Sequence, residues 1–434
     1  MSLEKSIMQL IVIIGVVSMS ACKTADRSCL EDSAYSTVNN DEVTLISSRK
    51  CGAATKRVNT YTGYTAYESG NEPIVSGDEF PVTVDYKVFE PNRRPLAAIV
   101  LFTGGTGDAG IDIDPEIEKI GNQNNFLVRS AQLFAEKGYL TIVLDNSSVE
   151  PFLIADNKKE NYDIYRILQF HSMDIVRTLN AENKYGLPVY FLGTSRGALS
   201  AYSQSKLSNG ISLSSPVTGE NGQRLYLSTA GSEDLGQFKN LSVDYVSVPT
   251  QIVSHKNDNC AVTMHAKAYD FFQAIDQVET QFVDEFGEKD SLGDIIDNPC
   301  CAKTFHGFLG IENAVIDKIS TWLAEQVAQV DNSVILPTTS NISLALNMSV
   351  SNTLDISENQ LVSNMNKNYE LLTLYPTSLY GASLEMNNGD ITYKNDVVSD
   401  RDSYTDAFIY LVKSSKNEND KIGYGLVTVE VKLN

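Results

Sequence analysis

Leu187-Pro-Val-Tyr-Phe-Leu-Gly-Thr-Ser-Arg-Gly-Ala-Leu-Ser200 joins an apolar run to a short turn bounded by glycines. The run over residues 189–192 lies between a proline and a glycine and predicts a buried strand, and the small residues after Gly197 favour a helix. Gly193-x-Ser195-x-Gly197 then has the form of a nucleophile elbow, in which the serine lies in a strained bend and glycines avoid collisions. Because so short a pattern also occurs in ordinary glycine turns, the flanking sequence decides whether it is catalytic.

Strands and helices alternate on both sides of the elbow. This order predicts a doubly wound, mostly parallel α/β sheet, with the elbow at the carboxyl edge where such sheets bind ligands. Residues 80–89 alternate apolar and polar side chains, which predicts an early edge strand. Thr103-Gly-Gly-Thr-Gly-Asp108 is either a tight turn or a loop whose N–H groups approach a ligand closely. The other predicted strands are residues 96–102, 139–144, 211–213 and 248–254, and the predicted helices are residues 126–137, 162–179 and 314–323.

The composition limits the partners of this chain. Its 434 residues suit two or three domains, and they carry a formal net charge of −21 with a sequence pI near 4.6. Such acidity disfavours nucleic acid as a partner and disfavours electrostatic docking to anionic lipid.

The first residues are typical of an export signal. An apolar run over residues 7–17, too short to span a bilayer, is followed by Met19-Ser-Ala-Cys22. This resembles the signal of bacterial lipoproteins, which implies that residues 1–21 are removed and that Cys22 carries lipid. Plain secretion is the alternative, because the charged region before the run is weak. We expect an extracytoplasmic location in the cell envelope, on the outer membrane or cell surface, with acyl chains as the membrane anchor.

Export permits disulfides, and the cysteines that remain after Cys22 are odd in number. Cys29 and Cys51 are the natural local pair in residues 22–75, a polar segment that we interpret as a tether and lead-in. Cys260 would pair with one residue of Cys300-Cys301, which leaves one thiol over. A zinc site is disfavoured because the sequence has no Cys-x-x-Cys spacing and only four histidines. We therefore expect neither a metal nor another cofactor.

A serine nucleophile needs a base, and a carboxylate that orients the base. In hydrolases with this elbow the chain order is serine, acid, histidine. His306 lies beside a glycine just before the last predicted helix, and it fits the base better than His255 at a strand end. Asp258 follows the strand at residues 248–254 and fits the acid. These positions predict a triad around Ser195.

Each candidate also has a structural interpretation. His306 could cap the helix that follows it, and Asp258 could form a turn, in which case Asp244 is the substitute acid. Asp145 at a strand end is typical of a turn, and His171 on the helix before the elbow is typical of a packing residue.

Three segments together resemble the α/β-hydrolase superfamily, over about residues 80–327. The segments that begin at Val248 and at Pro299 are similar to the acid and histidine segments of exported bacterial members, in which paired cysteines bridge these loops. The resemblance implies Ser195 as nucleophile, His306 as general base and then acid, and Asp258 as orienting carboxylate. The segments are Gly193-Thr-Ser-Arg-Gly197, Val248-Pro…His255-x-x-Asp258-x-Cys260 and Pro299-Cys300…His306-Gly-Phe-x-Gly310-x-Glu312.

The resemblance also implies an oxyanion hole, formed by the N–H of Arg196 and an N–H of the Gly104-Gly105-Thr106 turn. A Cys260–Cys300 disulfide would hold the acid loop and the histidine loop in register, which we state as a hypothesis. The expected hydrolase domain covers residues 76–328. Residues 218–245 lack clear periodicity and are expected to form a lid or cap.

Residues 335–434 change in composition to serine, threonine, asparagine and valine, with short alternating runs between turns. This pattern predicts a β-sandwich domain. Gly381-Ala-Ser-Leu and the run Phe408-Ile-Tyr-Leu-Val412 resemble bacterial Ig-like or cadherin-like repeats of cell-surface proteins. A calcium site is disfavoured, because the lysine-rich residues 413–421 replace the usual acidic turn. We expect a passive spacer in preference to a unit that contacts the cell surface or glycans.

Two functions remain open from the sequence. The first is a lipid-anchored extracytoplasmic serine hydrolase that cleaves a small-molecule carboxylic ester, in preference to an amide, through an acyl-enzyme at Ser195. The alternative is a non-catalytic interaction or adhesion protein of the cell surface that reuses the hydrolase fold. Because Ser195, Asp258 and His306 all carry competent side chains, the enzyme is favoured.

Overall fold

The structure is a computed structural model of the chain. Cys22, the predicted Cys29–Cys51 pair, Asp244 and the predicted lid at residues 218–245 lie outside the described residues. No helix in the described part of the chain has both the length and the apolarity to cross a membrane. The described residues are 31–32, 43–49, 53–68, 74–111, 124–148, 165–217, 247–275, 279–285, 299–330, 336, 338–363, 369–399, 401–414 and 421–433.

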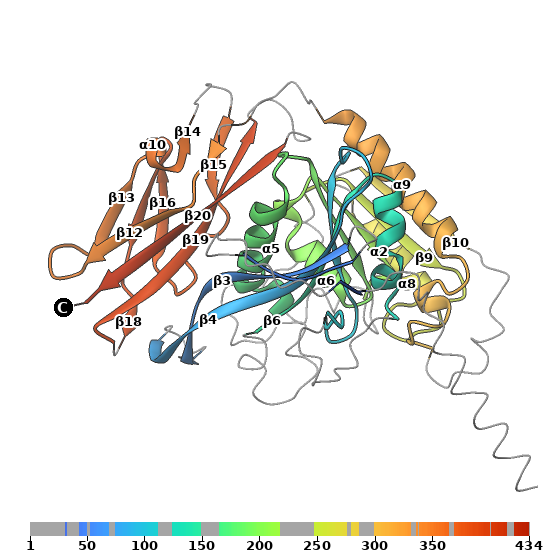
Figure 1. Cartoon of the computed structure of the whole chain (residues 1–434), viewed down its shortest axis with the longest axis horizontal. Coiled ribbons are helices and arrows are strands. Elements are labelled where there is room, and N and C mark those ends of the chain that lie inside the picture. Colours follow the sequence, from blue (N-terminus) through green and yellow to red (C-terminus); the bar gives the residue numbers. More distant parts are fainter. Residues whose placement is uncertain are drawn as a thin grey trace, which may run out of the picture.

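A large twisted sheet forms the centre of the molecule (Figure 1). Within the described residues its order is β1-β2-β3-β4-β6-β5-β7-β8-β9-β10. The pairs from β6 through β10 are parallel, and the pairs from β1 to β4 and on to β6 are antiparallel. The strands are β1 (Glu31–Asp32), β2 (Val43–Arg49), β3 (Ala53–Glu68), β4 (Ile74–Phe89), β5 (Ala98–Phe102), β6 (Leu140–Ser147), β7 (Val189–Thr194), β8 (Gly210–Ser214), β9 (Thr250–His255) and β10 (Thr280–Glu285).

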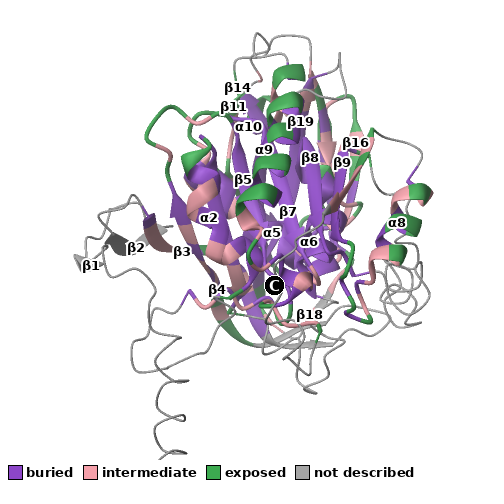
Figure 2. Ribbon diagram, turned by 90° about the vertical axis from the view of Figure 1, so that its right-hand side faces the viewer, coloured by how far each residue is buried: buried purple, intermediate pink, exposed green. Residues whose placement is uncertain are grey.

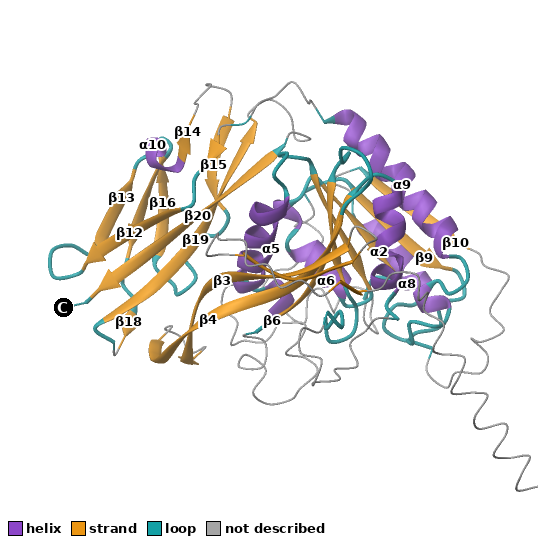
Figure 3. Cartoon of the chain, in the orientation of Figure 1, coloured by secondary structure: helices purple, strands orange, loops and turns teal. Residues whose placement is uncertain are grey.

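Helices cover both faces of this sheet (Figure 3). Alternate side chains of β5 show the two cores: Ile99 and Leu101 join the cluster of α2 (Phe126–Glu136) and α9 (Glu312–Gln329). Val100 and Phe102 join the opposite cluster. That second cluster takes in α5 (Gln169–Glu182), α6 (Gly197–Ser203) and α8 (His265–Ala274). Strands buried on both faces appear purple in Figure 2, and the sheet with helices on both faces is the doubly wound, mostly parallel α/β architecture that the sequence predicted.

One predicted strand has the wrong position. Residues 80–89 are part of β4, but β4 is not an edge strand, because β3 pairs along it on one side and β6 on the other. The sheet therefore takes in residues 53–68, which the sequence analysis assigned to the lead-in. Register shifts occur between Asn59 and Tyr61 and between Tyr64 and Ala66. These bulges interrupt the alternation by which β3 would have been recognised.

The other predicted strands and helices of this region are confirmed, with ends that differ by a few residues. The first three residues of the predicted 162–179 helix lie outside the described residues. In contrast, β10 was not predicted. Three residues of Thr280–Glu285 have acidic or amide side chains, which interrupt any apolar run, and no strong turn signal bounds the strand.

The C-terminal region is rich in strands, which is compatible with an all-β module; its Ig-like character stays a prediction. One sheet has the order β12-β20-β19-β15 and a second the order β13-β17-β16. Asn388 and Gly389 have φ values of 55° and 93°, so β16 and β17 are joined by the two-residue turn that such residues favour. The strands are β12 (Ile342–Asn347), β13 (Thr353–Ile356), β15 (Tyr369–Thr373), β16 (Ser383–Asn387), β17 (Asp390–Lys394), β19 (Ser403–Ser414) and β20 (Ile422–Lys432).

The C-terminal sheets pack against α5 of the large domain (Figure 1). Gln169 Nε2 donates to the carbonyl of Ser378 at 2.7 Å, and the hydroxyls of Ser172 and Tyr375 lie 2.6 Å apart. In addition, β18 (Val398–Ser399) pairs with the start of β4 and so joins the large sheet. One apolar cluster runs through both regions. The predicted spacer is therefore packed against the body of the molecule.

Phe170 tests whether this packing stabilises the whole chain. The ring lies on α5, is 5% exposed, and has its centroid 5.3 Å from that of Tyr61 and 6.3 Å from that of Tyr380. We expect Phe170→Ala to lower the free energy of unfolding by about 3 kcal/mol, because it removes a buried ring and leaves a cavity. Urea denaturation followed by fluorescence and circular dichroism measures the change.

The matched control is Tyr185→Ala, since Tyr185 is 62% exposed; its effect should stay within about 0.5 kcal/mol. A separate transition for the C-terminal sheets, unaffected by Phe170→Ala, would contradict the shared core.

Candidate active site

The elbow has the predicted geometry. Ser195 follows β7 with φ of 54°, a left-handed conformation that is rare outside glycine, and α6 begins at Gly197. A Cβ on Gly193 would lie 2.3 Å from the carbonyl oxygen of Gly197, and one on Gly197 would lie 2.1 Å from that of Phe102. The backbones therefore approach too closely at both positions for any residue but glycine.

The turn after β5 lies beside the elbow. A Cβ on Gly104 would lie 2.8 Å from the Cβ of Ser195, so the backbone of this turn is adjacent to the serine. Gly105 and Gly107 have φ values of 63° and 95°, and the N–H of Gly107 donates to the carbonyl of Gly104 at 3.2 Å. Gly105 and Thr106 are exposed at the tip. The predicted oxyanion residues Gly105 and Thr106 thus belong to a turn that adjoins Ser195 at Gly104, and Arg196 is the half-buried residue just before α6.

Asp145 and Asn146 at the end of β6 support this turn. Asn146 Nδ2 donates to the carbonyl of Thr106 at 3.0 Å. The carboxylate of Asp145 accepts from the N–H groups of Ala109 at 2.9 Å and Ile111 at 3.2 Å. Burial raises the pKa of Asp145 to about 7, against the opposing effect of these N–H bonds. The structure thus gives Asp145 the structural role expected of it.

Asp258 and His306 come together at the carboxyl edge of the sheet. Nδ1 of His306 lies 3.1 Å from Oδ2 of Asp258, and the two residues are 6% and 4% exposed. The carboxylate also accepts from the N–H of Cys260 at 3.0 Å. If Nδ1 carries the ring proton, the carboxylate orients the imidazole and leaves Nε2 as the basic nitrogen.

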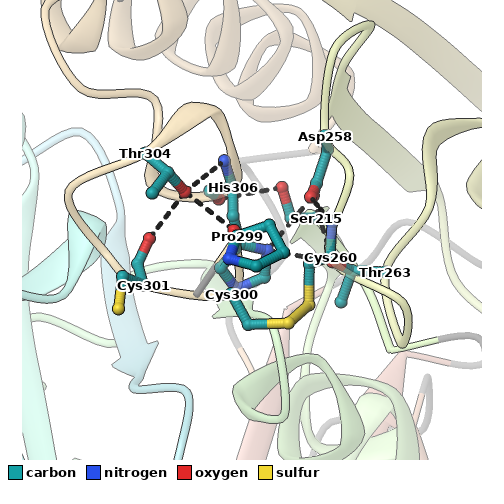
Figure 4. Close-up of a disulfide and its surroundings, with 9 residues drawn as sticks. All are labelled: Ser215, Asp258, Cys260, Thr263, Pro299, Cys300, Cys301, Thr304 and His306. Carbon is teal, nitrogen blue, oxygen red and sulfur yellow. Dashed lines mark hydrogen bonds and ion pairs between the residues drawn. A yellow bond between two sulfur atoms is a disulfide. The ribbon is translucent and has the colours of Figure 1, made fainter. Parts of the chain in front are cut away.

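Thr263 is a residue of this pair that the sequence analysis missed. Its Oγ1 lies 3.0 Å from Oδ2 of Asp258 and 2.9 Å from Nδ1 of His306 (Figure 4). The hydroxyl donates to the carboxylate and so fixes one of its oxygens. No motif marks a threonine in an irregular loop, and only the folded chain shows the contact.

Ser214 and Ser215 connect the backbone of Ser195 to that of His306 through two hydrogen bonds. The N–H of Ser195 donates to the carbonyl of Ser214 at 3.0 Å, and the hydroxyl of Ser215 donates to the carbonyl of His306 at 3.0 Å. Among the described residues no hydrogen bond joins the Ser195 hydroxyl to the His306 ring. The structure thus brings the acid and the histidine into direct contact. The serine is linked to the histidine backbone through Ser214 and Ser215.

A disulfide joins the acid loop to the histidine loop. Of the two partners left open, the structure pairs Cys260 with Cys300, with Cα atoms 4.6 Å apart, and Cys301 is a free thiol (Figure 4). The bond spans 40 residues of sequence, and its ends lie two residues after Asp258 and six before His306.

Arg129 on α2 holds the other side of the histidine loop. Its Nε donates to Oε1 of Glu312 at 3.0 Å, and one of its terminal nitrogens donates to the carbonyl of Ala302 at 3.2 Å. The second terminal nitrogen donates to the carbonyl of Gly307. The histidine is thus flanked by two carbonyls bound to one guanidinium, and Glu312 of the quoted motif is the counter-ion.

His255 and His171 have packing roles. His255 stacks on Phe305 with centroids 4.4 Å apart, and its Nδ1 accepts from the N–H of Asn257. His171 packs against Phe102 and Tyr165, as predicted, and burial lowers its pKa to about 3, so it is neutral at physiological pH.

Metal ligands are limited in the described part of the chain. There, Asp258, Cys260 and His306 are the one group whose potential ligand atoms lie within 4.8 Å of one another. Cys260 is in the disulfide, so its sulfur is not available as the thiolate that a metal binds.

No protein-family model matches the sequence, and no curated protein matches it. Among solved structures, a ferulic acid complex of Est1E from Butyrivibrio proteoclasticus is 14% identical, with 57% of this chain and 97% of that chain covered and a TM-score of 0.37. A carboxyl esterase from Bacillus coagulans is 11% identical, with 63% and 99% covered and a TM-score of 0.37. An acylaminoacyl peptidase from Pyrococcus horikoshii is 12% identical, with 65% and 47% covered and a TM-score of 0.36. Likeness of this extent leaves the activity to be argued from the site.

The disulfide gives a direct test of how the two loops are held. We expect Cys260→Ser/Cys300→Ser to lower the free energy of unfolding by about 4 kcal/mol, because the unfolded chain loses a loop closure of this length. Thermal and urea unfolding measure the change, with reduced wild type as a second comparison.

Cys301→Ser is the control, since it removes a thiol outside the bridge and should leave stability unchanged. Equal stability of the double variant and the control would show that the bond does not contribute to the fold.

Proposed function

We propose that this chain is a serine hydrolase that cleaves a small-molecule carboxylic ester through an acyl-enzyme at Ser195. The observation that carries the proposal is a serine with left-handed backbone on a strand-to-helix turn, at the same sheet edge as a buried aspartate and histidine in contact. Such a turn presents a nucleophile, and such a pair supplies an oriented base.

The proposed reaction begins when the Ser195 hydroxyl attacks the ester carbonyl and Nε2 of His306 takes its proton. Asp258 stabilises the imidazolium through Nδ1. The N–H of Arg196 and an N–H of Gly105 or Thr106 stabilise the oxyanion of the tetrahedral intermediate, each donor contributing roughly 3 kcal/mol to the transition state. His306 then protonates the leaving alkoxide, and water, activated by the same histidine, hydrolyses the acyl-enzyme.

An ester is the least demanding substrate for this machinery, because an alkoxide leaves a tetrahedral intermediate far more readily than an amide anion does, so an amine must first be protonated on nitrogen. The alternative is a non-catalytic interaction protein that reuses the fold and contacts the cell surface or glycans through its C-terminal sheets. The paired Asp258 and His306 favour the enzyme, since an interaction protein has no need for a buried carboxylate in contact with a histidine.

We further propose that the chain is exported and anchored to the cell envelope by lipid on Cys22. The support for the lipid anchor is in the sequence, where a short apolar run is followed by Met19-Ser-Ala-Cys22. The disulfide between Cys260 and Cys300 fits an oxidising compartment.

A fluorophosphonate probe tests the enzyme directly, because it reacts only with an activated serine. We expect the wild type to be labelled at Ser195, and Ser195→Ala to lose the label. Asp258→Asn should lower kcat on a p-nitrophenyl ester by about 10⁴-fold, since the histidine loses its orienting partner. Peptide mass spectrometry locates the label, and a panel of short- and long-chain esters, aminoacyl and acetyl-sugar substrates defines the acyl group.

Ser349→Ala, in an exposed C-terminal turn, is the control and should be labelled as the wild type is. Absence of label on folded wild type, or equal labelling of Ser195→Ala, would favour the interaction protein instead.

Lipidation is tested by expressing the full chain in a bacterial host fed an alkyne fatty acid. We expect the wild type to carry the label and to sediment with membranes, and Cys22→Ala to lose both, because Cys22 is the proposed acceptor. Cys301→Ser should behave as the wild type does. An unlabelled wild type found in the medium would show plain secretion.

A further inference from the structure

Arg166 lies three residues before α5, and its side chain contacts both the turn after β5 and helix α6. It is 4% exposed. One terminal nitrogen of its guanidinium donates to the hydroxyl of Ser200 at 3.0 Å, on the helix that follows the elbow. The other donates to the carbonyl of Thr103 at 3.1 Å and lies 3.5 Å from that of Gly105. One side chain thus connects the turn after β5 to α6.

These contacts determine where the neighbouring N–H groups point. A peptide unit is planar and trans, so its carbonyl and the following N–H point in opposite directions. When Arg166 binds the carbonyls of Thr103 and Gly105, the N–H groups of Gly104 and Thr106 are directed away from it. The backbone of this turn adjoins Ser195 at Gly104, and the N–H of Thr106 is one of the proposed oxyanion donors. Holding these two planes therefore holds that donor relative to the serine.

The backbone that carries this side chain is also held in place. The carbonyl of Arg166 accepts from the hydroxyl of Ser203 at 2.8 Å and from Nε2 of Gln204 at 3.2 Å. Oε1 of Gln204 lies 3.4 Å from the hydroxyl of Tyr375 in the C-terminal region. The guanidinium therefore acts from a backbone that α6 supports on one side and the C-terminal sheets contact through one further side chain.

We propose that Arg166 is the positioning residue of the oxyanion turn, holding the planes of its peptide groups relative to α6 so that its N–H donors meet the developing oxyanion. The inference rests on the proposed hydrolase function. Arg166 touches no reacting atom in this scheme and acts through the backbone. Since the oxyanion forms only in the transition state, the loss of this positioning should appear in kcat and not in KM.

The test compares Arg166→Met, Arg166→Lys and Arg166→Ala with the matched control Arg177→Met. Arg177 is on α5, and its Nε donates to the carbonyl of Thr60 at 3.1 Å. We expect Arg166→Met to lower kcat on a p-nitrophenyl ester by about 10- to 100-fold with KM within about three-fold. This is less than the roughly 100- to 1,000-fold cost of removing a donor, because the backbone N–H is displaced and not lost. Arg166→Lys should also lose activity, because an ammonium lacks the fork that reaches both elements. Arg177→Met should keep kcat.

Chemical rescue separates positioning from general damage to the fold. Millimolar guanidinium, well below denaturing concentrations, should restore part of kcat to Arg166→Ala and leave Arg177→Met unchanged. Circular dichroism and the Ser195 labelling rate monitor folding and nucleophile activation. If Arg166→Met does not fold, Arg166→Lys and the rescue of Arg166→Ala provide the same readout.

A kcat within two-fold of wild type in folded Arg166→Met, with wild type labelled at Ser195, would overturn this inference and leave the hydrolase proposal intact. An unlabelled wild type would overturn the hydrolase proposal itself.

Discussion

The close contact between the backbones of the elbow and of β5 is the constraint on which the site depends. The absence of a side chain on Gly197 lets α6 begin against the carbonyls of Phe102 and Thr103. The same contact brings the turn at Gly104 beside Ser195. The pairing of two neighbouring parallel strands thus brings the nucleophile and the turn that carries the candidate oxyanion donors together.

The remaining groups leave the sheet on separate loops, so they need ties that the strands do not supply. The Cys260–Cys300 disulfide joins the acid loop to the histidine loop, and Arg129 joins the histidine loop to α2. Most of these ties end on backbone carbonyls or on a covalent bond. Such contacts fix the path of the loop backbone and depend little on which other side chains the loop carries.

The sequence was sufficient wherever the signal is local. The elbow glycines, Asp258 after its strand and His306 before the last helix follow from chain order and turn chemistry. In contrast, β3 was missed because bulges near Asn59 and Tyr64 break its alternation. Thr263 and Arg166 were missed because tertiary packing decides what they contact. Thr263 lies 43 residues from His306 in the sequence, and Arg166 lies 63 residues from Thr103.

Arginine suits these joints for a physical reason. Its guanidinium carries five N–H donors in a rigid planar fork, so one side chain can bind carbonyls on two elements at once. A lysine presents its three donors from a single nitrogen on a flexible stem, so it cannot reach oxygens as far apart or in as fixed a geometry. Burial adds a cost, because the charge must leave water, and the cost is offset only when several oxygens surround the group. An arginine buried among three oxygens at the turn beside a nucleophile is therefore a costly arrangement, and one that fold stability alone gives little reason to keep.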